Sequence, residues 1–343
     1  MLRYAMAATA LRLFSVSPQT KGIYRRLAND VGGKRRVAHG IPDHYVNRAR
    51  YLLDTIRRCG AIRDGDRILE VGTGWLHWES IIIRLFYDVE AVLFDVWDSR
   101  QLESFRIYFS QLAGRIDAEF EMTAGQRAQA HSLLQAICTT GSFDEIYQLL
   151  GFRYVTDPSG TLHQFESQSF RAVVSGSVLQ HVKRDILPGY ILDFQRLLQP
   201  GGYSIHMIDL GDQISYYDRS VSIKNYLRYS DFVWKVCFQG DIQYFNRVQR
   251  PEWLDLFEKA GLVLVEEEFR TTDLDNLKVN IQTTFVLLKQ FPALKKRIVV
   301  SESGIKAKHE VTMLKEAGVD AVLVGESILK SHDIPAKVKE LLG

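Results

Sequence analysis

The chain has 343 residues, of which 46% are hydrophobic and 24% charged, a composition typical of a soluble globular protein with one large domain or two. The formal net charge of +2 is close to balance and excludes a protein-wide positive field of the kind that favours nucleic acid. The three cysteines, Cys59, Cys138 and Cys237, match neither a disulfide framework nor a metal-ligand spacing. We therefore expect a cytoplasmic protein with reduced thiols and no metal site.

Residues 1–40 are predicted to form a separate N-terminal segment that is helical and basic. Met1–Val16 is apolar, but two arginines interrupt it, which argues against a membrane-spanning segment and against a signal peptide. We expect a short amphipathic helix that packs on the following domain, and a helix lying on a membrane surface is the alternative. The cations between residues 24 and 36 are interpreted as a solvated loop, or as a contact for an anionic substrate or a lipid headgroup.

A strand, a glycine turn and a helix follow each other between residues 67 and 86. Ile68–Val71 predicts a short buried strand, and Gly72 and Gly74 allow the backbone to turn sharply and to approach a ligand closely. This unit opens many nucleotide-binding α/β sheets. The third glycine of a dinucleotide fingerprint would fall at His77, so the pattern departs from the one that binds NAD.

The spacing Glu70-x-Gly72-x-Gly74 resembles the first motif of class I S-adenosylmethionine-dependent methyltransferases, which often reads Asp/Glu-x-Gly-x-Gly-x-Gly. Leu76 replaces the last glycine of that pattern. The resemblance implies that Glu70, Gly72 and Gly74 hold S-adenosylmethionine. The alternative is a strand, turn and helix whose glycines serve no ligand, since short glycine patterns recur by accident.

The second predicted strand, Val89–Val96, supplies the other half of a nucleoside site. An acid at the end of this strand accepts hydrogen bonds from ribose hydroxyls in nucleotide-binding sheets, which assigns that role to Asp95. Asp98 is a near competitor. Residues 99–150 are predicted to be mostly helical and form a longer connection than usual between two strands.

A third strand is predicted at Phe152–Val155, with Asp157 in the turn that follows it. The family resemblance places a polar contact to the adenine at Asp157. The alternative is ordinary turn chemistry, because Asp-Pro-Ser-Gly is a good turn sequence without any ligand.

The fourth predicted strand ends at Ser175 and leads into Val178-Leu179-Gln180-His181-Val182. This run resembles the Val-Leu-x-His-Val pattern of small-molecule methyltransferases. Ser175 would lie at the carboxyl end of a central strand, where ligands bind in open α/β sheets, and Leu179 is expected to pack near the cofactor. His181 is a candidate general base because imidazole titrates near neutral pH. The alternative is that His181 caps or packs the start of a helix.

Pro200-Gly201-Gly202 and the fifth predicted strand, residues 203–209, also resemble the family. His206 and Asp209 on this strand are further candidates for deprotonating or orienting the methyl acceptor. Residues 209–248, which we call the aromatic insertion, are rich in tyrosine, phenylalanine and tryptophan. They predict a lid or a substrate-binding insertion, or else an insertion with a small core of its own.

The sheet is expected to finish with an antiparallel pair of strands at Leu262–Phe269 and Ile281–Leu288. The fold class is therefore α/β, with a Rossmann-like, seven-stranded methyltransferase sheet over residues 41–290. This domain predicts methyl transfer from S-adenosylmethionine to a small-molecule or glycan-precursor acceptor, with no nucleic-acid partner. A catalytically inactive domain that only binds the cofactor is an alternative.

Residues 297–343 resemble the last two strand–helix units of indole-3-glycerol phosphate synthase, a (β/α)8 barrel. The matching runs are Val-Val-Ser-Glu-Ser-Gly-Ile, residues 299–305, and Leu-Val-Gly-Glu-Ser, residues 323–327. The resemblance implies vestigial phosphate contacts at Glu302, Ser303, Gly304, Gly325, Glu326 and Ser327. About 47 residues are present where a barrel needs about 200 or more, so we expect a partial βαβα fragment from a gene fusion.

The C-terminal fragment leaves two questions open. Two parallel strands with two helices cannot bury both faces of a sheet alone, so the fragment docks, self-associates or is loosely folded. A protein of tryptophan biosynthesis, related to indole-3-glycerol phosphate synthase, is the alternative function that this segment suggests.

Overall fold

The computed structural model divides the chain into two compact units, Met1–Glu267 and Glu268–Gly343, and each is described by itself. We call them the first unit and the C-terminal unit. The residues that the structure describes are 2–218, 220–269, 284–285, 288–289, 299–302, 305–324, 328, 331 and 333–342. Within residues 2, 25, 28–36 and 302 the description is limited to the backbone.

Three helices precede the sheet: α1 (Leu2–Phe14), α2 (Pro18–His39) and α3 (Asp43–Cys59). The prediction of a solvated loop within residues 24–36 is wrong, because this backbone is helical and belongs to α2. A capping box at Ser17 and a proline in the first turn start α2, although each internal glycine costs a helix roughly 1 kcal/mol. Helix α3 buries one apolar face and ends at Gly60 in a left-handed conformation.

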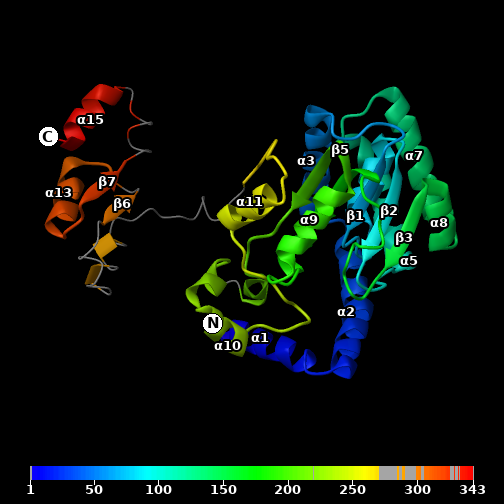
Figure 1. Cartoon of the computed structure of the whole chain (residues 1–343), viewed down its shortest axis with the longest axis horizontal. Helices are drawn as coiled ribbons and strands as arrows, with labels where there is room; N and C mark the ends of the chain where they lie inside the picture. The colour runs from blue at the N-terminus through cyan, green and yellow to red at the C-terminus, as the bar shows by residue number, and fades with distance from the viewer. Residues whose placement is uncertain are drawn as a thin grey trace. The chain divides into compact units, whose positions relative to one another are not determined.

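A five-stranded parallel sheet forms the centre of the first unit, in the order β3-β2-β1-β4-β5 (Figure 1). Its strands pair in register so that their carboxyl ends meet at one edge, with Val71 opposite Phe94 and Ser175 opposite His206. The strands are β1 (Arg67–Val71), β2 (Glu90–Asp95), β3 (Phe152–Thr156), β4 (Phe170–Gly176) and β5 (Leu198–Met207). The three central strands β2, β1 and β4 are mostly buried apolar runs, because helices cover both faces of the sheet.

Two hydrophobic cores flank the sheet. One contains Ile68 and Leu93 together with the apolar face of α3 and most of the helical connection between β2 and β3. The other contains Leu69 and Val92 and packs against α9 (Leu187–Leu197) and α11 (Arg250–Lys259), on the opposite side in Figure 1. The helices of the first layer are α4 (Trp78–Phe86), α5 (Leu102–Ala113), α6 (Ile116–Glu119), α7 (Ala124–Thr139) and α8 (Phe143–Leu150).

A third core joins α1 to the aromatic insertion. Tyr4 of α1 donates its hydroxyl hydrogen to the buried carboxylate of Asp212 over 2.7 Å, and its ring lies 5.7 Å from that of Phe238. The insertion consists of η2 (Gln213–Tyr217), η3 (Asn225–Arg228), α10 (Asp231–Cys237) and connecting segments. This confirms that the N-terminal helix packs on the domain and that the insertion has its own core.

The predicted antiparallel finish of the sheet is not found, because the sheet contains five strands among the described residues rather than seven. Leu262–Phe269 forms no ladder, and Val263 and Val265 are 86% and 66% exposed. Ion pairs of Glu266 with Arg58 and of Glu267 with Arg250 hold this segment on helices α3 and α11 instead. Most of the second predicted strand, 281–288, lies outside the described residues, and residues 284, 285 and 288 are helical.

The C-terminal unit contains two parallel strands and two longer helices in the predicted order. They are β6 (Val300–Glu302), α13 (Lys308–Glu316), β7 (Ala321–Leu323) and α15 (Ile334–Leu342). Its small core is formed by Leu288, Ile305, Leu314, Val319 and Leu341. Across the described parts of both units, every helix falls short of the length and apolar character needed to cross a membrane.

Candidate functional site

The glycine turn, residues 72–75, and the end of β2 are joined directly by hydrogen bonds. The Gly74 amide donates to Asp95 Oδ2 over 2.8 Å, and the Gly72 amide donates to the Phe94 carbonyl oxygen over 2.8 Å. Burial raises the pKa of Asp95, and backbone donors, the Gly74 amide first among them, oppose that rise. The predicted convergence of Gly72, Gly74 and Asp95 is therefore present in the structure.

The two glycines serve different purposes. Both have positive φ angles, 68° at Gly72 and 61° at Gly74. A Cβ atom at Gly72 would lie 2.5 Å from the methyl carbons of Val178, so this glycine is needed for close packing of the loop after β4. A Cβ atom at Gly74 would meet nothing nearer than 4.0 Å, so the turn has open space on this side.

Asp98, the competitor of Asp95, points elsewhere. Its carboxylate accepts two hydrogen bonds from the Arg100 guanidinium, over 3.0 and 2.7 Å, and these hold the pKa of Asp98 below its usual range. The carboxylate that faces the glycine turn is that of Asp95. Asp157 lies just beyond β3, where its exposed carboxylate accepts the Ser159 amide over 2.9 Å and thereby shapes its own turn.

Glu70 has a buried carboxyl group that stabilises the start of helix α4. Its Oε2 accepts the Ser80 amide over 2.9 Å. Burial and the neighbouring Glu79 raise the pKa of Glu70 well above its ordinary value. Glu79 in turn pairs with Arg48 of α3 over 2.7 Å. A side chain at Gly176 would collide with Glu79, so these buried charges lie directly beside the end of β4.

His77, at the place of the missing third glycine, has the left-handed conformation that glycine usually adopts, with φ of 50°. The His77 ring is buried, and the resulting desolvation lowers the pKa of His77 to about 3. Nδ1 lies 2.9 Å from the Thr73 hydroxyl, and Nε2 lies 2.9 Å from the hydroxyl of Tyr147 on α8. The glycine turn is therefore bonded to the helical connection between β2 and β3.

The two residues predicted at the end of β4 have buried side chains. The Ser175 hydroxyl lies 2.8 Å from His206 Nδ1, and the second ring nitrogen of His206 lies 2.6 Å from the Ser204 hydroxyl. The His206 ring is stacked between Phe194 and Phe257, and burial lowers its pKa to about 3. Leu179 is fully buried in the core beneath α9. None of these side chains presents a free group to the edge of the sheet.

His181 lies where the loop after β4 meets the aromatic insertion. Its Nδ1 is 2.7 Å from the Tyr244 carbonyl oxygen, and its Nε2 is 3.4 Å from Gln213 Nε2. The ring keeps an exposed edge, although surrounding protein lowers the pKa of His181 through desolvation while Asp209 acts in the opposite direction. Asp209 accepts the Gly211 amide over 2.8 Å and the Tyr216 hydroxyl over 3.1 Å.

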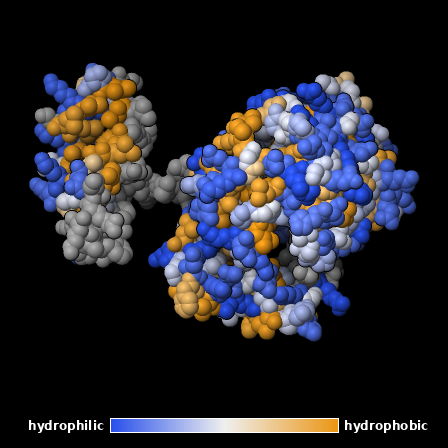
Figure 2. Space-filling model, viewed as in Figure 1, coloured by the Kyte–Doolittle hydropathy of each residue, from blue (hydrophilic) through white to orange (hydrophobic). Residues whose placement is uncertain are grey.

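Asn246, which the sequence pattern does not distinguish from its polar neighbours, fastens the aromatic insertion to this loop. Its side-chain amide donates to the Leu179 and Val182 carbonyl oxygens over 2.8 and 3.1 Å, and its backbone amide donates to the Gln180 carbonyl oxygen over 2.9 Å. Figure 2 shows the surface hollowed between the sheet and the part formed by α1 and the aromatic insertion. The candidate acceptor residues come from the elements that bound this hollow.

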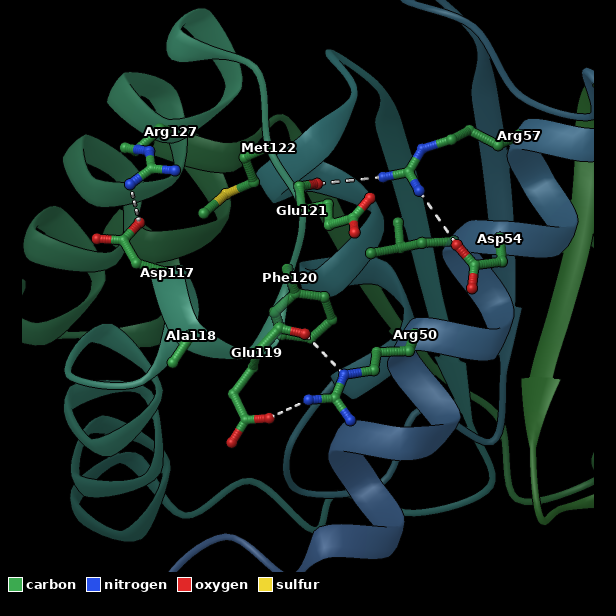
Figure 3. A pocket seen from close by; sticks show the side chains of 11 residues that line it. Arg50, Asp54, Arg57, Asp117, Ala118, Glu119, Phe120, Glu121, Met122 and Arg127 are labelled. Atoms are coloured by element: carbon green, nitrogen blue, oxygen red, sulfur yellow. Dashed lines mark hydrogen bonds and ion pairs between the residues drawn. The ribbon is translucent and has the colours of Figure 1, made fainter.

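A second feature, a cavity of about 640 Å³, lies away from the glycine turn between α3 and the α6–α7 region (Figure 3). It is lined by three arginines, each paired with a carboxylate: Arg50 with Glu119, Arg57 with Asp54, and Arg127 with Asp117. Residues predicted for the cofactor or the acceptor are absent from this lining. All three arginines are thus ion-paired with carboxylates of the lining, and we assign the cavity no ligand.

The remaining predicted site residues belong to the C-terminal unit. Ser303, Gly304, Gly325, Glu326 and Ser327 lie outside the described residues, and Glu302 is described only as the last backbone position of β6. Among the described residues, no three histidine, cysteine, aspartate or glutamate side chains lie together in a way that could bind a metal ion.

Comparison with known families divides the chain at nearly the place where the structure does. A family model described as a methyltransferase domain matches residues 43–267, and a model described as indole-3-glycerol phosphate synthase matches residues 270–341. Two solved structures match most of this chain at low similarity. They are phosphoethanolamine N-methyltransferase 2 of Haemonchus contortus with S-adenosyl-L-methionine (16% identity, 70% of this chain, 42% of that chain, TM-score 0.38) and a cyclopropane synthase of Mycobacterium tuberculosis (15%, 71%, 70%, 0.37).

Curated relatives match the C-terminal part of the chain. Indole-3-glycerol phosphate synthase of Caldanaerobacter subterraneus is 42% identical over 95 residues, which are 28% of this chain and 35% of that protein. The synthase of Dehalococcoides mccartyi is 47% identical over 70 residues, 20% of this chain and 26% of that protein. The chain thus spans about a third or less of the length of these relatives.

Proposed function

Because this chain belongs, over residues 43–267, to the methyltransferase domain family, we propose that it transfers the methyl group of S-adenosylmethionine to a small-molecule acceptor. The observation that carries the proposal is the hydrogen bond from the Gly74 amide to Asp95. It makes the glycine turn and the acid after β2 one continuous surface at the carboxyl edge of the sheet, where ligands bind in open α/β folds.

The residues of the turn suit an adenosine-bearing cofactor. The Asp95 carboxylate accepts the Gly74 and Val96 amides, and Trp97 adds a third backbone donor, so lone-pair capacity remains for a ribose hydroxyl. The open side of Gly74 leaves room for close approach of a ligand to the backbone. Asp157 extends this edge from β3 and is our proposed polar contact to the adenine. Glu70 acts from below by holding the start of α4.

When bound, S-adenosylmethionine supplies a methyl group on a sulfonium, and the protein has to align the acceptor and exclude water. We assign the proton transfer to His181. A carbonyl oxygen only accepts, so the contact with the Tyr244 carbonyl places the hydrogen on Nδ1 and leaves the lone pair on Nε2. The lowered pKa keeps the ring neutral at neutral pH. His181 can therefore remove a proton from an acceptor hydroxyl or amine.

Asp209 is proposed to orient this site, since its charge favours the protonated form of His181. His206 is a weaker candidate, because both of its ring nitrogens already contact serine hydroxyls. The exposed rings of Tyr216 and Tyr217, which are 62% and 50% exposed, offer apolar faces to a small molecule or a glycan precursor. The aromatic insertion thus serves as the acceptor-binding lid.

Both the compact units and the family matches change between residues 267 and 270. We propose the domain boundary there, earlier than the residues 290–297 expected from the sequence. The C-terminal unit carries the synthase motif, but the match covers only about a third of the length of the synthase. We propose that this unit has no carboxy-lyase activity and adds no step to methyl transfer.

The test uses the full-length protein. Calorimetric titration with S-adenosylmethionine is expected to show one site, and methyl-labelled cofactor with cell extract is expected to give a labelled small molecule. Binding without any labelled product would favour the inactive, cofactor-binding alternative. The absence of binding would contradict the proposal, and turnover of the anthranilate-derived ribulose phosphate would instead support the synthase alternative.

A further inference from the structure

His77 is strained in a way that asks for an explanation. It is a fully buried, non-glycine residue with φ of 50°, at the position where a third glycine would fall in a nucleotide-binding turn. A left-handed conformation is unfavourable for a residue that carries a Cβ atom. Strain of this kind persists only where the surroundings hold it in place. The surroundings of His77 therefore show what the turn requires.

Two hydrogen bonds fix the His77 ring between the glycine turn and helix α8. Nδ1 contacts the Thr73 hydroxyl and Nε2 contacts the Tyr147 hydroxyl, both over 2.9 Å. Four aromatic rings enclose the imidazole, with centroids between 5.6 and 5.9 Å away; they belong to Phe105, Phe143, Tyr147 and Tyr154. Thr73 is 4% exposed, so this contact is shielded from water.

The direction of the hydrogen bonds follows from the partner at the far end. The Arg100 guanidinium lies 4.5 Å from the Tyr154 ring centroid and 6.0 Å from that of Tyr147, and its positive charge makes the Tyr147 hydroxyl a stronger hydrogen-bond donor. The Tyr147 hydroxyl therefore directs its own hydrogen to His77 Nε2. His77 then donates from Nδ1 to Thr73, and the Thr73 hydroxyl keeps its hydrogen to donate to a further acceptor.

We propose that Tyr147 is a positioning residue for the cofactor: it acts through His77 to hold Thr73 and the glycine turn in the conformation that binds S-adenosylmethionine. The long helical connection between β2 and β3 thereby replaces the missing third glycine with a side-chain contact. This inference rests on the proposed function and adds to it a residue that lies some 70 positions from the turn, since 70 residues separate His77 from Tyr147.

The experiment compares four variants of the full-length protein with the unmodified chain by calorimetric titration with S-adenosylmethionine. Tyr147→Phe removes only the hydroxyl and keeps the ring that packs on Phe143 and Tyr154. His77→Gly restores the glycine and removes the link, and the third variant combines both changes. The control is Tyr203→Phe on β5, which deletes a hydroxyl that donates to the Cys59 carbonyl oxygen over 3.0 Å.

Tyr147→Phe is expected to weaken cofactor affinity about fivefold, in keeping with the loss of one buried hydrogen bond. In the His77→Gly background the same change is expected to have no further effect on affinity, which a merely structural role would not produce. Tyr203→Phe also removes one hydrogen bond, so it should lower thermal stability about as much as Tyr147→Phe does. It should leave cofactor affinity within about twofold of that of the unmodified chain. Unchanged affinity in Tyr147→Phe, or an equal loss in both backgrounds, would overturn the inference.

Hydrogen exchange of the peptide that covers residues 70–77 gives a second measurement that does not depend on ligand. Exchange of the turn amides is expected to be faster in Tyr147→Phe than in the unmodified chain and in Tyr203→Phe. If the unmodified chain failed to bind S-adenosylmethionine, the proposed function would be wrong. The exchange rates would then still show whether Tyr147 holds the turn, and equal rates would refute that part as well.

Discussion

The glycine turn of the first unit and the two loops of the C-terminal unit each carry the motif of a known family, but very different amounts of structure surround them. Asp95, His77 and Val178 contact the glycine turn from three separate elements. The C-terminal unit has strands of three residues each and a core of five buried side chains. A motif retains its chemistry only where the rest of the fold holds its residues in place.

The contacts of the glycine turn are tested most severely at Gly72. Gly72→Ala combines a positive φ, which costs alanine about 1–2 kcal/mol, with a contact against Val178 that has to be relieved at about 1–3 kcal/mol. We expect the free energy of unfolding to fall by about 2–5 kcal/mol. Gly74→Ala has the same backbone strain but free space, so about 1–2 kcal/mol is expected. Urea unfolding measures both, and equal losses would contradict the packing role of Gly72.

Acid is expected to destabilise the first unit through its buried histidines. Burial lowers the pKa of His77 and His206 to about 3, whereas an unfolded histidine has a pKa of about 6.5. Their contribution is complete above pH 6.5 and is lost as the pH falls, because only the unfolded chain then binds the protons. The stability should drop by up to about 1.4 kcal/mol per pH unit for each histidine.

Urea unfolding followed by tryptophan fluorescence at pH 7 and pH 5.5 measures this slope, since the five tryptophans all lie before residue 268. His206→Asn is expected to reduce the slope by up to about 1.4 kcal/mol per pH unit, because one buried histidine is removed. The matched control is His131→Asn, at an exposed site beside Asp117, which should leave the slope unchanged. A slope that is the same in all three proteins would show that burial of these rings does not govern the acid response.

The cofactor contact itself is tested at Asp95. Asp95→Ala removes a charged acceptor from the Gly74 amide and from the proposed ribose contact, so S-adenosylmethionine affinity should fall about tenfold or more. Asp98→Ala breaks an ion pair with Arg100 instead and is expected to change affinity by less than about twofold. Titration calorimetry compares the two. A larger loss in the Asp98 variant would move the ribose contact to that residue.

The smallest effect on cofactor binding is expected in the C-terminal unit. Leu314 is fully buried in its core, so Leu314→Ala should destabilise that unit by about 2–5 kcal/mol. Affinity for S-adenosylmethionine should stay within about twofold of the unmodified chain. Limited proteolysis after residue 268, together with calorimetry, measures both quantities. A parallel loss of affinity would show that the two units act together.

The sequence predicted the parts of this site that depend on local backbone chemistry. The order of strands and the meeting of Gly74 with Asp95 follow from periodicity and from the parallel topology, which places strand ends together. The contact of His77 with Tyr147 could not be predicted, because it joins residues 70 positions apart through a side-chain hydrogen bond. A histidine at a glycine position, together with an unusually long connection, was the signal that could have suggested it.

Two other expectations depended on tertiary partners that the sequence does not reveal. Leu262–Phe269 has the alternation of a strand, yet its glutamates pair with Arg58 and Arg250 on helices and its valines remain exposed. His206 stays a predicted candidate for orienting the acceptor, but the contacts of its two ring nitrogens with the Ser175 and Ser204 hydroxyls could not be predicted from the sequence. Propensity describes a segment in isolation, and these contacts decide between outcomes of similar propensity.

The third core has a consequence for how this protein is made. Tyr4 is translated 208 positions before Asp212, the carboxylate that accepts its hydroxyl hydrogen. During synthesis, the apolar face of α1 therefore stays uncovered until the aromatic insertion has been made. The sheet, whose strands lie between these two segments in the chain, can assemble earlier. The third core therefore forms last, because it needs both α1 and the aromatic insertion. We therefore expect that proteolytic loss of α1 would disturb the aromatic insertion and leave the glycine turn unchanged.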